Sequence, residues 1–271
     1  DKNNLPYDVV VERLHIEEPE PPAPVTEPEK TFEEVLDEHP VSIQVNGQWQ
    51  TFPNAKAAEE ASYEEYKANL RRNAKNFRIT DEHLGEGGPK AKFQANIEAI
   101  KLLKYLEETT AQATPEQQEA LSRYVGWGGL ADAFDPEKPA WASEYAQLKE
   151  LLTPEEYAAS RSSTLNAHYT SPTVIQAIYE AVGRMGFETG NILEPSMGVG
   201  NFFGMLPEEM RNSRLYGVEL DPVSGRIAKQ LYPKADITVG GFETTDRRDF
   251  FDLAIGNVPF GQYQVNDKAY N

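Results

Sequence analysis

Asn191-Ile-Leu-Glu-Pro-Ser-Met-Gly-Val-Gly-Asn-Phe-Phe203 is the stretch of sequence that decides the fold. It predicts a short apolar strand that ends in the acid Glu194, followed by a tight turn with Gly198 and Gly200 and then a helix. Glycine has no Cβ, so the backbone of such a turn can approach a ligand closely. The pattern is typical of a nucleoside-bearing cofactor site at the carboxyl end of a parallel strand. An ordinary strand-to-helix turn that needs small residues explains it equally well.

Strands and helices alternate through the last hundred residues. An amphipathic helix is expected after Ser171, and short apolar strands are expected at 192–193, 215–219, 236–239 and 252–256. This alternation indicates an α/β fold with a parallel, doubly wound sheet. We therefore predict a Rossmann-like core with a partial sheet, preceded by a mainly helical N-terminal region with a small β-hairpin.

The sequence upstream predicts two further regions. Residues 1–40 form an acidic, proline-rich tail or linker, which cannot bury much apolar area. Residues 41–164 form a hairpin with an Asn46-Gly47 turn followed by helices, two of them beginning after Thr114 and Thr153. We expect Trp49 to pack beneath the hairpin. Residues 165–271 then form the N-terminal part of the α/β core.

Composition narrows the classes of function. The 271 residues contain no cysteine and four scattered histidines, so a metal site is not expected. No apolar run approaches the length of a membrane span, and a cytoplasmic location is expected. The net charge is −18, of which −9 lies in residues 1–40, so the chain is not a basic, nucleic-acid-binding surface. Gly85-Glu-Gly-Gly-Pro89 lacks the spacing of a phosphate-binding loop, which excludes an ATPase in these residues.

Two further positions indicate chemistry at the sheet. Glu219 ends the second strand 19 residues after Gly200, where ribose hydroxyls are bound in such folds, but the glycine spacing is not that of an NAD site. The fourth strand runs into Asn257-Val-Pro-Phe260. An Asn side chain can accept and donate hydrogen bonds to an amine-bearing ring, and Phe offers a stacking face for a base. An ordinary loop with its Phe in the core is the structural alternative.

A glycine-rich segment, Tyr124-Val-Gly-Trp-Gly-Gly-Leu-Ala-Asp-Ala-Phe134, separates two helices. So many glycines carry a cost in conformational entropy. The favoured interpretation is a tight helix–helix corner with Trp127 in the core. The alternative is a lid or platform beside a cofactor or a flipped-out base.

Together these motifs resemble the S-adenosylmethionine-dependent DNA N6-adenine methyltransferases over about residues 166–261. The matching segments are Tyr169-Thr-Ser-Pro172, Glu194-Pro-Ser-Met-Gly-Val-Gly-Asn-Phe202, Tyr216-Gly-Val-Glu-Leu-Asp-Pro222 and Asn257-Val-Pro-Phe260. Their order is that of the group in which the cofactor loop precedes the catalytic motif. Tyr124-Val-Gly-Trp-Gly-Gly129 also resembles the corresponding stretch of very large methylase–helicase proteins of conjugative elements and phages.

The resemblance implies a set of site residues. Glu194 would face the amino group of S-adenosylmethionine, Glu219 would hold its ribose, and Leu220 and Phe242 would contact its adenine. The full cofactor-binding set is Tyr169, Thr170, Glu194, Pro195, Ser196, Gly198, Gly200, Asn201, Phe202, Glu219, Leu220 and Phe242. The catalytic set is Asn257, Val258, Pro259 and Phe260.

The implied reaction is methyl transfer to a flipped-out adenine. The base would stack on Phe260, while the Asn257 side chain and the Val258 carbonyl accept hydrogen bonds from its exocyclic amine, without a metal. Val258 departs from the family, which has Pro at this position. Gly240-Gly-Phe-Glu243 departs from the usual Gly-Asp-Phe, so either Gly241 or Glu243 stands where an Asp binds the cofactor adenine.

The end of the sequence lies close to the fourth strand, whereas the family's sheet has seven strands. We therefore expect the chain to be a fragment that does not methylate DNA by itself and that reaches DNA through regions outside it. Two alternatives remain open. One is a methyltransferase acting on RNA adenine or protein glutamine, and the other is a degenerate, non-catalytic module of a mobile-element protein.

Overall fold

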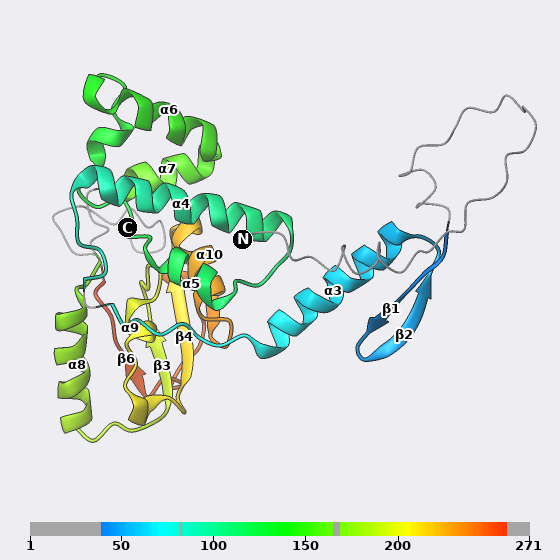
Figure 1. Cartoon of the computed structure of the whole chain (residues 1–271). Helices are drawn as coiled ribbons and strands as arrows, with labels where there is room; N and C mark the ends of the chain where they lie inside the picture. Colours follow the sequence, from blue (N-terminus) through cyan, green and yellow to red (C-terminus); the bar gives the residue numbers. More distant parts are fainter. Residues whose placement is uncertain (1–38, 82, 165–168, 259–271) are drawn as a thin grey trace, which may run out of the picture. The chain divides into compact units, whose positions relative to one another are not determined.

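The structure is a computed structural model that describes residues 39–81, 83–164 and 169–258 (Figure 1). The chain divides into two compact units, residues 1–62 and 63–271. No helix in the described ranges is long and apolar enough to cross a membrane. No group of three or more His, Cys, Asp or Glu side chains in the same ranges could hold a metal ion.

The first unit contains an antiparallel hairpin, β1 (Val41–Val45) and β2 (Gln48–Phe52). Both turn residues have positive φ, 51° for Asn46 and 74° for Gly47, as the predicted type I′ turn requires. The helix α3 (Ala55–Asn73) follows, and its first turn is capped by the Asn54 side chain, which accepts a hydrogen bond from the Ala57 N–H at 2.8 Å. The predicted hairpin and helix are therefore confirmed.

Trp49 is 70 % exposed, so the prediction that it packs beneath the hairpin is wrong. The two-residue turn sets a register in which Trp49 is paired with Gln44. Successive side chains of a strand point to opposite faces. This register therefore places Trp49 on the polar face of the ribbon, opposite the face that carries Val41, Ile43 and Val45.

The second unit has a helical part made of four α-helices. These are α4 (Pro89–Glu108), α5 (Pro115–Ser122), α6 (Ala142–Leu151) and α7 (Pro154–Ser163). Thr114 and Thr153 cap α5 and α7 as predicted, and each forms a full capping box with the residue three positions on. The Thr-Pro-Glu pattern thus locates both helix starts correctly.

The remainder of the second unit, as far as its residues are described, is built on a parallel sheet of four strands. These are β3 (Asn191–Glu194), β4 (Arg214–Glu219), β5 (Asp236–Val239) and β6 (Leu253–Ala254), in the spatial order β5-β4-β3-β6. The chain leaves β3 toward β4 and later returns to its other side as β6. The direction of winding therefore reverses between β3 and β6, and this is where α/β sheets bind ligands at their carboxyl edge.

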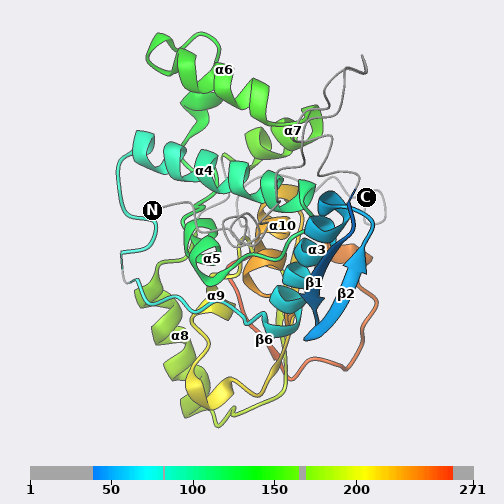
Figure 2. The same cartoon turned by 45° about the vertical axis from the view of Figure 1, so that its right-hand side comes forward.

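Three helices accompany the sheet, α8 (Pro172–Arg184), α9 (Asn201–Gly204) and α10 (Pro222–Leu231). In both views α5 of the helical part lies beside α10 (Figures 1 and 2). The Gln118 side chain of α5 donates hydrogen bonds to the last carbonyls of α10, those of Gln230 and Leu231, at 3.0 and 3.1 Å. The parallel α/β arrangement predicted from the sequence is confirmed.

One hydrophobic core runs through the helical part and the sheet. Trp127 belongs to this core with no exposed surface, and its ring meets Phe93 and Phe134 edge-on at centroid distances of 6.0 and 5.2 Å. Such edge-to-face pairs are favourable beyond the area that they bury. The glycine-rich segment is therefore a corner with its Trp in the core, as favoured from the sequence.

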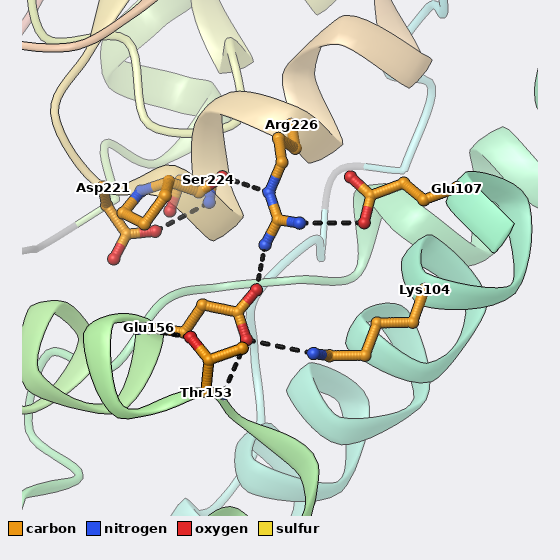
Figure 3. A network of polar contacts seen from close by, with 8 residues as sticks. Lys104, Glu107, Thr153, Glu156, Asp221, Ser224 and Arg226 are labelled. Atoms are coloured by element: carbon orange, nitrogen blue, oxygen red, sulfur yellow. Dashed lines mark hydrogen bonds and ion pairs between the residues drawn. The ribbon is translucent and has the colours of Figure 1, made fainter. Parts of the chain in front are cut away.

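A polar cluster fastens α10 to the helical part (Figure 3). Arg226 of α10 forms ion pairs with Glu107 of α4, at 2.8 Å, and with Glu156 of α7. Glu156 also accepts from Lys104 at 3.0 Å and from the Thr153 N–H at 2.9 Å. Burial alone would raise the pKa of Glu156, but these donors together lower it. The cluster therefore holds an ionised carboxylate in a largely buried position.

Candidate active site at the carboxyl edge of the sheet

The turn after β3 owes its glycines to the protein's own side chains. Gly198 and Gly200 have φ values of 55° and 83°, in the left-handed region. A Cβ at Gly200 would lie 2.5 Å from the ring of Tyr232, and one at Gly198 would lie 3.2 Å from the ring of Tyr169. Both positions therefore require glycine for conformation and packing even before a ligand is considered. The side chains that impose the packing requirement, Tyr169 and Tyr232, are distant from the turn in the sequence.

Glu194 ends β3 as a buried carboxylate. Its side chain belongs to a residue that is 2 % exposed, and its Oε2 atom has no hydrogen-bond partner among the described residues. Burial raises its pKa well above the ordinary value, and the nearby charge of Glu219 adds to this. An acid in this position would be stabilised by a cationic or hydrogen-bond-donating group.

Glu219 ends the neighbouring strand β4 and crosses to the same turn. Its Oε2 accepts from the Gly198 N–H at 2.6 Å, and its Oε1 accepts from the Asp221 N–H at 2.7 Å. Burial raises its pKa, while these backbone donors oppose the rise. Each carboxylate oxygen has two acceptor positions, so both retain capacity for a further donor such as a ribose hydroxyl.

Asp221 is a member of this cluster that the sequence reasoning missed. Its Oδ1 caps α10 by accepting from the Ser224 N–H at 2.7 Å, while its buried Oδ2 has no partner among the described residues. Burial raises its pKa as well. The sequence signal was present, because Asp221-Pro222 is a typical helix start, but that signal predicts a cap and not a second open carboxylate oxygen.

Two large apolar side chains stand exposed at the ends of adjacent strands. Leu220 follows β4 and is 74 % exposed, and Phe242 follows β5 and is 51 % exposed. Exposed apolar surface that lies beside convergent polar groups is typical of a ligand site. Both residues were assigned to the cofactor adenine by resemblance, and their exposure is compatible with that role.

Gly241, in the loop after β5, lies beside the side chain of Glu243. The Glu243 carboxylate curls back over Gly241 and fills the space that a Cβ there would need. A carboxylate is thus present at this position, supplied from two residues further along the chain.

The predicted catalytic motif begins after Ile255 and Gly256, the two residues that follow β6, the strand beside β3. A Cβ on Gly256 would lie 3.5 Å from Cγ of Glu194 and 3.6 Å from Cδ of Pro195, so this strand end adjoins the turn after β3. Asn257 and Val258 follow as exposed residues. Pro259 and Phe260 lie outside the described residues.

The remaining predicted residues fall into two groups. Tyr169, Thr170, Pro195, Ser196 and Asn201 are half-buried around the turn. Phe202 is 2 % exposed and packs edge-on against Tyr179 at 6.1 Å, while its carbonyl accepts from the Tyr179 hydroxyl at 2.9 Å. Its side chain is therefore a core residue behind the turn.

Two known proteins are similar to parts of this chain. The chain is 29 % identical over 180 residues to "Defense against restriction protein B" of Escherichia phage P1, a match that covers 65 % of this chain and 6 % of the phage protein. It is 39 % identical over 92 residues to "Type II methyltransferase M.CvrRI" of Paramecium bursaria Chlorella virus XZ-6E, covering 34 % of this chain and 24 % of that protein.

No family model matches the chain, and no solved structure matches it significantly. The matches span less than a quarter of the length of either relative. The two relatives nevertheless correspond to the two resemblances that the motifs indicate, one to a methyltransferase and one to a phage protein. Over these stretches the chain is thus similar to a type II methyltransferase and to a phage protein, the two kinds of protein that its motifs resemble.

Proposed function

We propose that this chain carries the cofactor half and the catalytic motif of a DNA methyltransferase that transfers a methyl group from S-adenosylmethionine to N6 of adenine. The observation that carries the proposal is the buried Glu194 side chain, whose Oε2 atom has no hydrogen-bond partner among the described residues and which lies near the charge of Glu219. Glu194 and Glu219 end the neighbouring strands β3 and β4 beside the same turn. Asn257 follows β6, the strand on the other side of β3.

The residues of the turn fit S-adenosylmethionine. Glu194 offers an unsatisfied buried acceptor for an ammonium group. The positive charge of that group would lower the raised pKa of Glu194 toward its ordinary value. Glu219 is held by two backbone donors with acceptor capacity left for ribose hydroxyls. Leu220 and Phe242 offer apolar surface from adjacent strand ends for an adenine ring. When bound, the cofactor supplies an electrophilic methyl group on a sulfonium.

The remaining chemistry belongs to the residues after β6. The Asn257 side-chain oxygen and the Val258 carbonyl accept hydrogen bonds from the exocyclic amine of a flipped-out adenine, which orients the nitrogen lone pair toward the methyl group. Val258 keeps the carbonyl that the family's Pro provides but lacks its fixed φ. Rate enhancement then comes from positioning and polarisation.

The charge of the chain bears on how DNA is held. A net charge of −18 repels phosphates, so we infer that most contacts to DNA come from protein regions outside residues 1–271. The work of this chain is then to bind the cofactor and to present the catalytic motif, in a cytoplasmic protein.

The test uses the natural protein that carries this chain. S-adenosylmethionine binding is measured by calorimetry, and N6-methyladenine is measured by mass spectrometry of unmodified plasmid DNA after reaction. We expect Asn257→Ala to reduce methylation by at least 100-fold with cofactor affinity within threefold, and Asn212→Ala, at an exposed asparagine in a loop, to change neither.

Two results would redirect the proposal. Cofactor binding without Asn257-dependent transfer would identify a non-catalytic module. Transfer to RNA or to protein glutamine, with DNA left unmodified, would replace the substrate.

A further inference from the structure

A buried asparagine of α4 holds the backbone of the glycine corner, which we define as residues 124–130. Asn96 of α4 has no exposed surface. Its Nδ2 donates to the Gly126 carbonyl at 2.6 Å, and its Oδ1 accepts from the Val125 N–H at 2.8 Å. One side chain therefore satisfies two backbone groups of the corner and fixes the position of the corner relative to α4.

Two residues of the corner, Tyr124 and Gly126, contact the ring of Tyr169. Gly126 has a φ of 68°, and a Cβ there would lie 2.5 Å from Cε2 of Tyr169. The ring of Tyr124 meets the same tyrosine edge-on, with centroids 6.5 Å apart. The corner thus forms one wall against the Tyr169 ring, with no space for an additional methyl group at Gly126.

The other edge of Tyr169 touches the turn that we assign to the cofactor. A Cβ on Gly198 would lie 3.2 Å from Cε1 and Cζ of Tyr169 and 3.3 Å from its hydroxyl. The N–H of this same Gly198 donates to Glu219. The Tyr169 hydroxyl also lies 3.5 Å from the Ser224 hydroxyl, in the first turn of α10.

The Tyr124 hydroxyl is a further sign that the corner belongs to the site. It is buried and has no hydrogen-bond partner among the described residues. Burial raises the pKa of Tyr124, and the charges of Asp221 and Glu219 add to the rise. The corner therefore contributes a polar group near the two carboxylates.

We propose that Gly126, held by Asn96 in the glycine corner, is a positioning residue of the cofactor site, acting through the Tyr169 ring on the Gly198 turn. The proposal rests on the function proposed above. It makes the helical part a component of the cofactor site, because Asn96, Gly126, Tyr169 and Gly198 form a continuous packed path that ends at the ribose-binding acid. A change at the corner then alters cofactor affinity without touching the cofactor.

The experiment compares two glycines of the same corner. Gly126→Ala and Gly129→Ala both place a Cβ at a positive φ, 68° and 75°. A Cβ on Gly129 meets nothing within 4 Å, so Gly129→Ala carries the backbone strain without the collision. Calorimetry with S-adenosylmethionine and hydrogen–deuterium exchange of residues 196–201 in the cofactor-free chain are measured for both.

We expect Gly126→Ala to lower cofactor affinity at least tenfold and to speed exchange in residues 196–201, while Gly129→Ala stays within threefold of the natural chain. Equal behaviour of the two variants in both measurements would overturn the proposal. If the natural chain binds no S-adenosylmethionine, the proposed function fails, and the exchange measurement still decides whether the corner controls the turn.

A second variant covers the case in which Gly126→Ala does not fold. Tyr169→Leu removes the ring from the path and leaves the Asn96 contacts intact. We expect it to speed exchange in residues 196–201 but not in residues 124–127. Two double variants are then compared, Tyr169→Leu with Gly126→Ala and Tyr169→Leu with Gly129→Ala. Both should show the same exchange rate in residues 196–201, because without the Tyr169 ring a Cβ at Gly126 has nothing to collide with. Unchanged exchange in residues 196–201 of Tyr169→Leu contradicts the proposal.

Discussion

The Oε2 atom of Glu219 accepts a hydrogen bond from the Gly198 N–H at 2.6 Å, and this bond joins the end of β4 to the turn after β3. The same carboxylate is anchored at its other oxygen by the Asp221 N–H at 2.7 Å. The acid that should hold ribose is therefore also a brace for the turn that should hold the rest of the cofactor. One side chain couples two parts of the site.

Replacing this brace should weaken cofactor binding by two routes. Glu219→Ala removes the proposed ribose acceptor and frees the Gly198 N–H. Hydrogen bonds to charged groups contribute about 1.5–3 kcal/mol each, so calorimetry should show S-adenosylmethionine affinity about 10- to 100-fold lower. Glu188→Ala, at an exposed acid before β3, is the control and should leave affinity unchanged. Equal affinities of the two variants would rule out this role for Glu219.

Glu194 should make the cofactor-free protein less stable as pH rises. Burial raises its folded-state pKa above the ordinary 4.5, so between the two values the folded state holds a proton that the unfolded state has lost. Stability then falls as pH rises through that window. Glu194→Gln should flatten this decline and raise the free energy of unfolding at pH 7 by about 1–2 kcal/mol.

Denaturant melts of the cofactor-free protein between pH 5 and pH 8 measure the effect. Glu219 and Asp221 also have raised pKa values, so part of the slope should remain in Glu194→Gln. The same variant should bind S-adenosylmethionine more weakly, because a neutral amide that also donates hydrogen bonds replaces the carboxylate that accepts from the ammonium group. A pH slope identical to that of the natural chain would show that Glu194 is not held protonated by the fold.

The Arg226 cluster should contribute substantially to stability. Arg226→Ala leaves the buried Glu156 without one of its cations, and breaking a buried pair costs about 3 kcal/mol. Arg184→Ala removes a surface pair with Glu180 at 3.4 Å and should cost less than about 1 kcal/mol. Denaturant melts at pH 7 compare the two variants, and equal losses would contradict the assignment.

The pH dependence of the same pair has the opposite sign to that of Glu194. The pKa of Glu156 is lowered in the folded state, so its contribution is present above its ordinary pKa and is lost as pH falls through the folded value. Arg226→Ala should therefore lose less stability than the natural chain between pH 6 and pH 3.

Local patterns predicted the elements but not what joins them. Thr114, Thr153 and Asn46-Gly47 place helix starts and a turn correctly, because caps and turns depend on neighbouring residues. Trp49 was misplaced because that prediction rested on the need of a two-stranded ribbon for a packing partner, whereas the register set by the turn pairs Trp49 with Gln44 on the polar face. The reason for Gly200 is the ring of Tyr232, 32 residues further on, and no local pattern shows it.

The candidate site divides in the same way. Glu194 and Glu219 were found because each ends a strand, and parallel strands end at one edge. Asp221 and Tyr124 were missed because their significance is an open polar atom in a buried place, which only the packed structure shows. The ion pairs of Arg226 span 70 and 119 residues along the chain and leave no spacing signal.

The position of Glu243 allows a direct test of how the cofactor adenine is held. The resemblance implies an Asp where this chain has Gly241, and the Glu243 carboxylate already occupies the space beside that glycine. Glu243→Ala should therefore lower S-adenosylmethionine affinity about 5- to 10-fold, the loss of about one ordinary hydrogen bond at an exposed position. Adding Gly241→Asp to Glu243→Ala should recover most of it, whereas Gly241→Asp alone displaces the Glu243 side chain and gains little. Calorimetry on the three variants decides the matter, and a double variant as weak as Glu243→Ala would show that no carboxylate acts from this strand end.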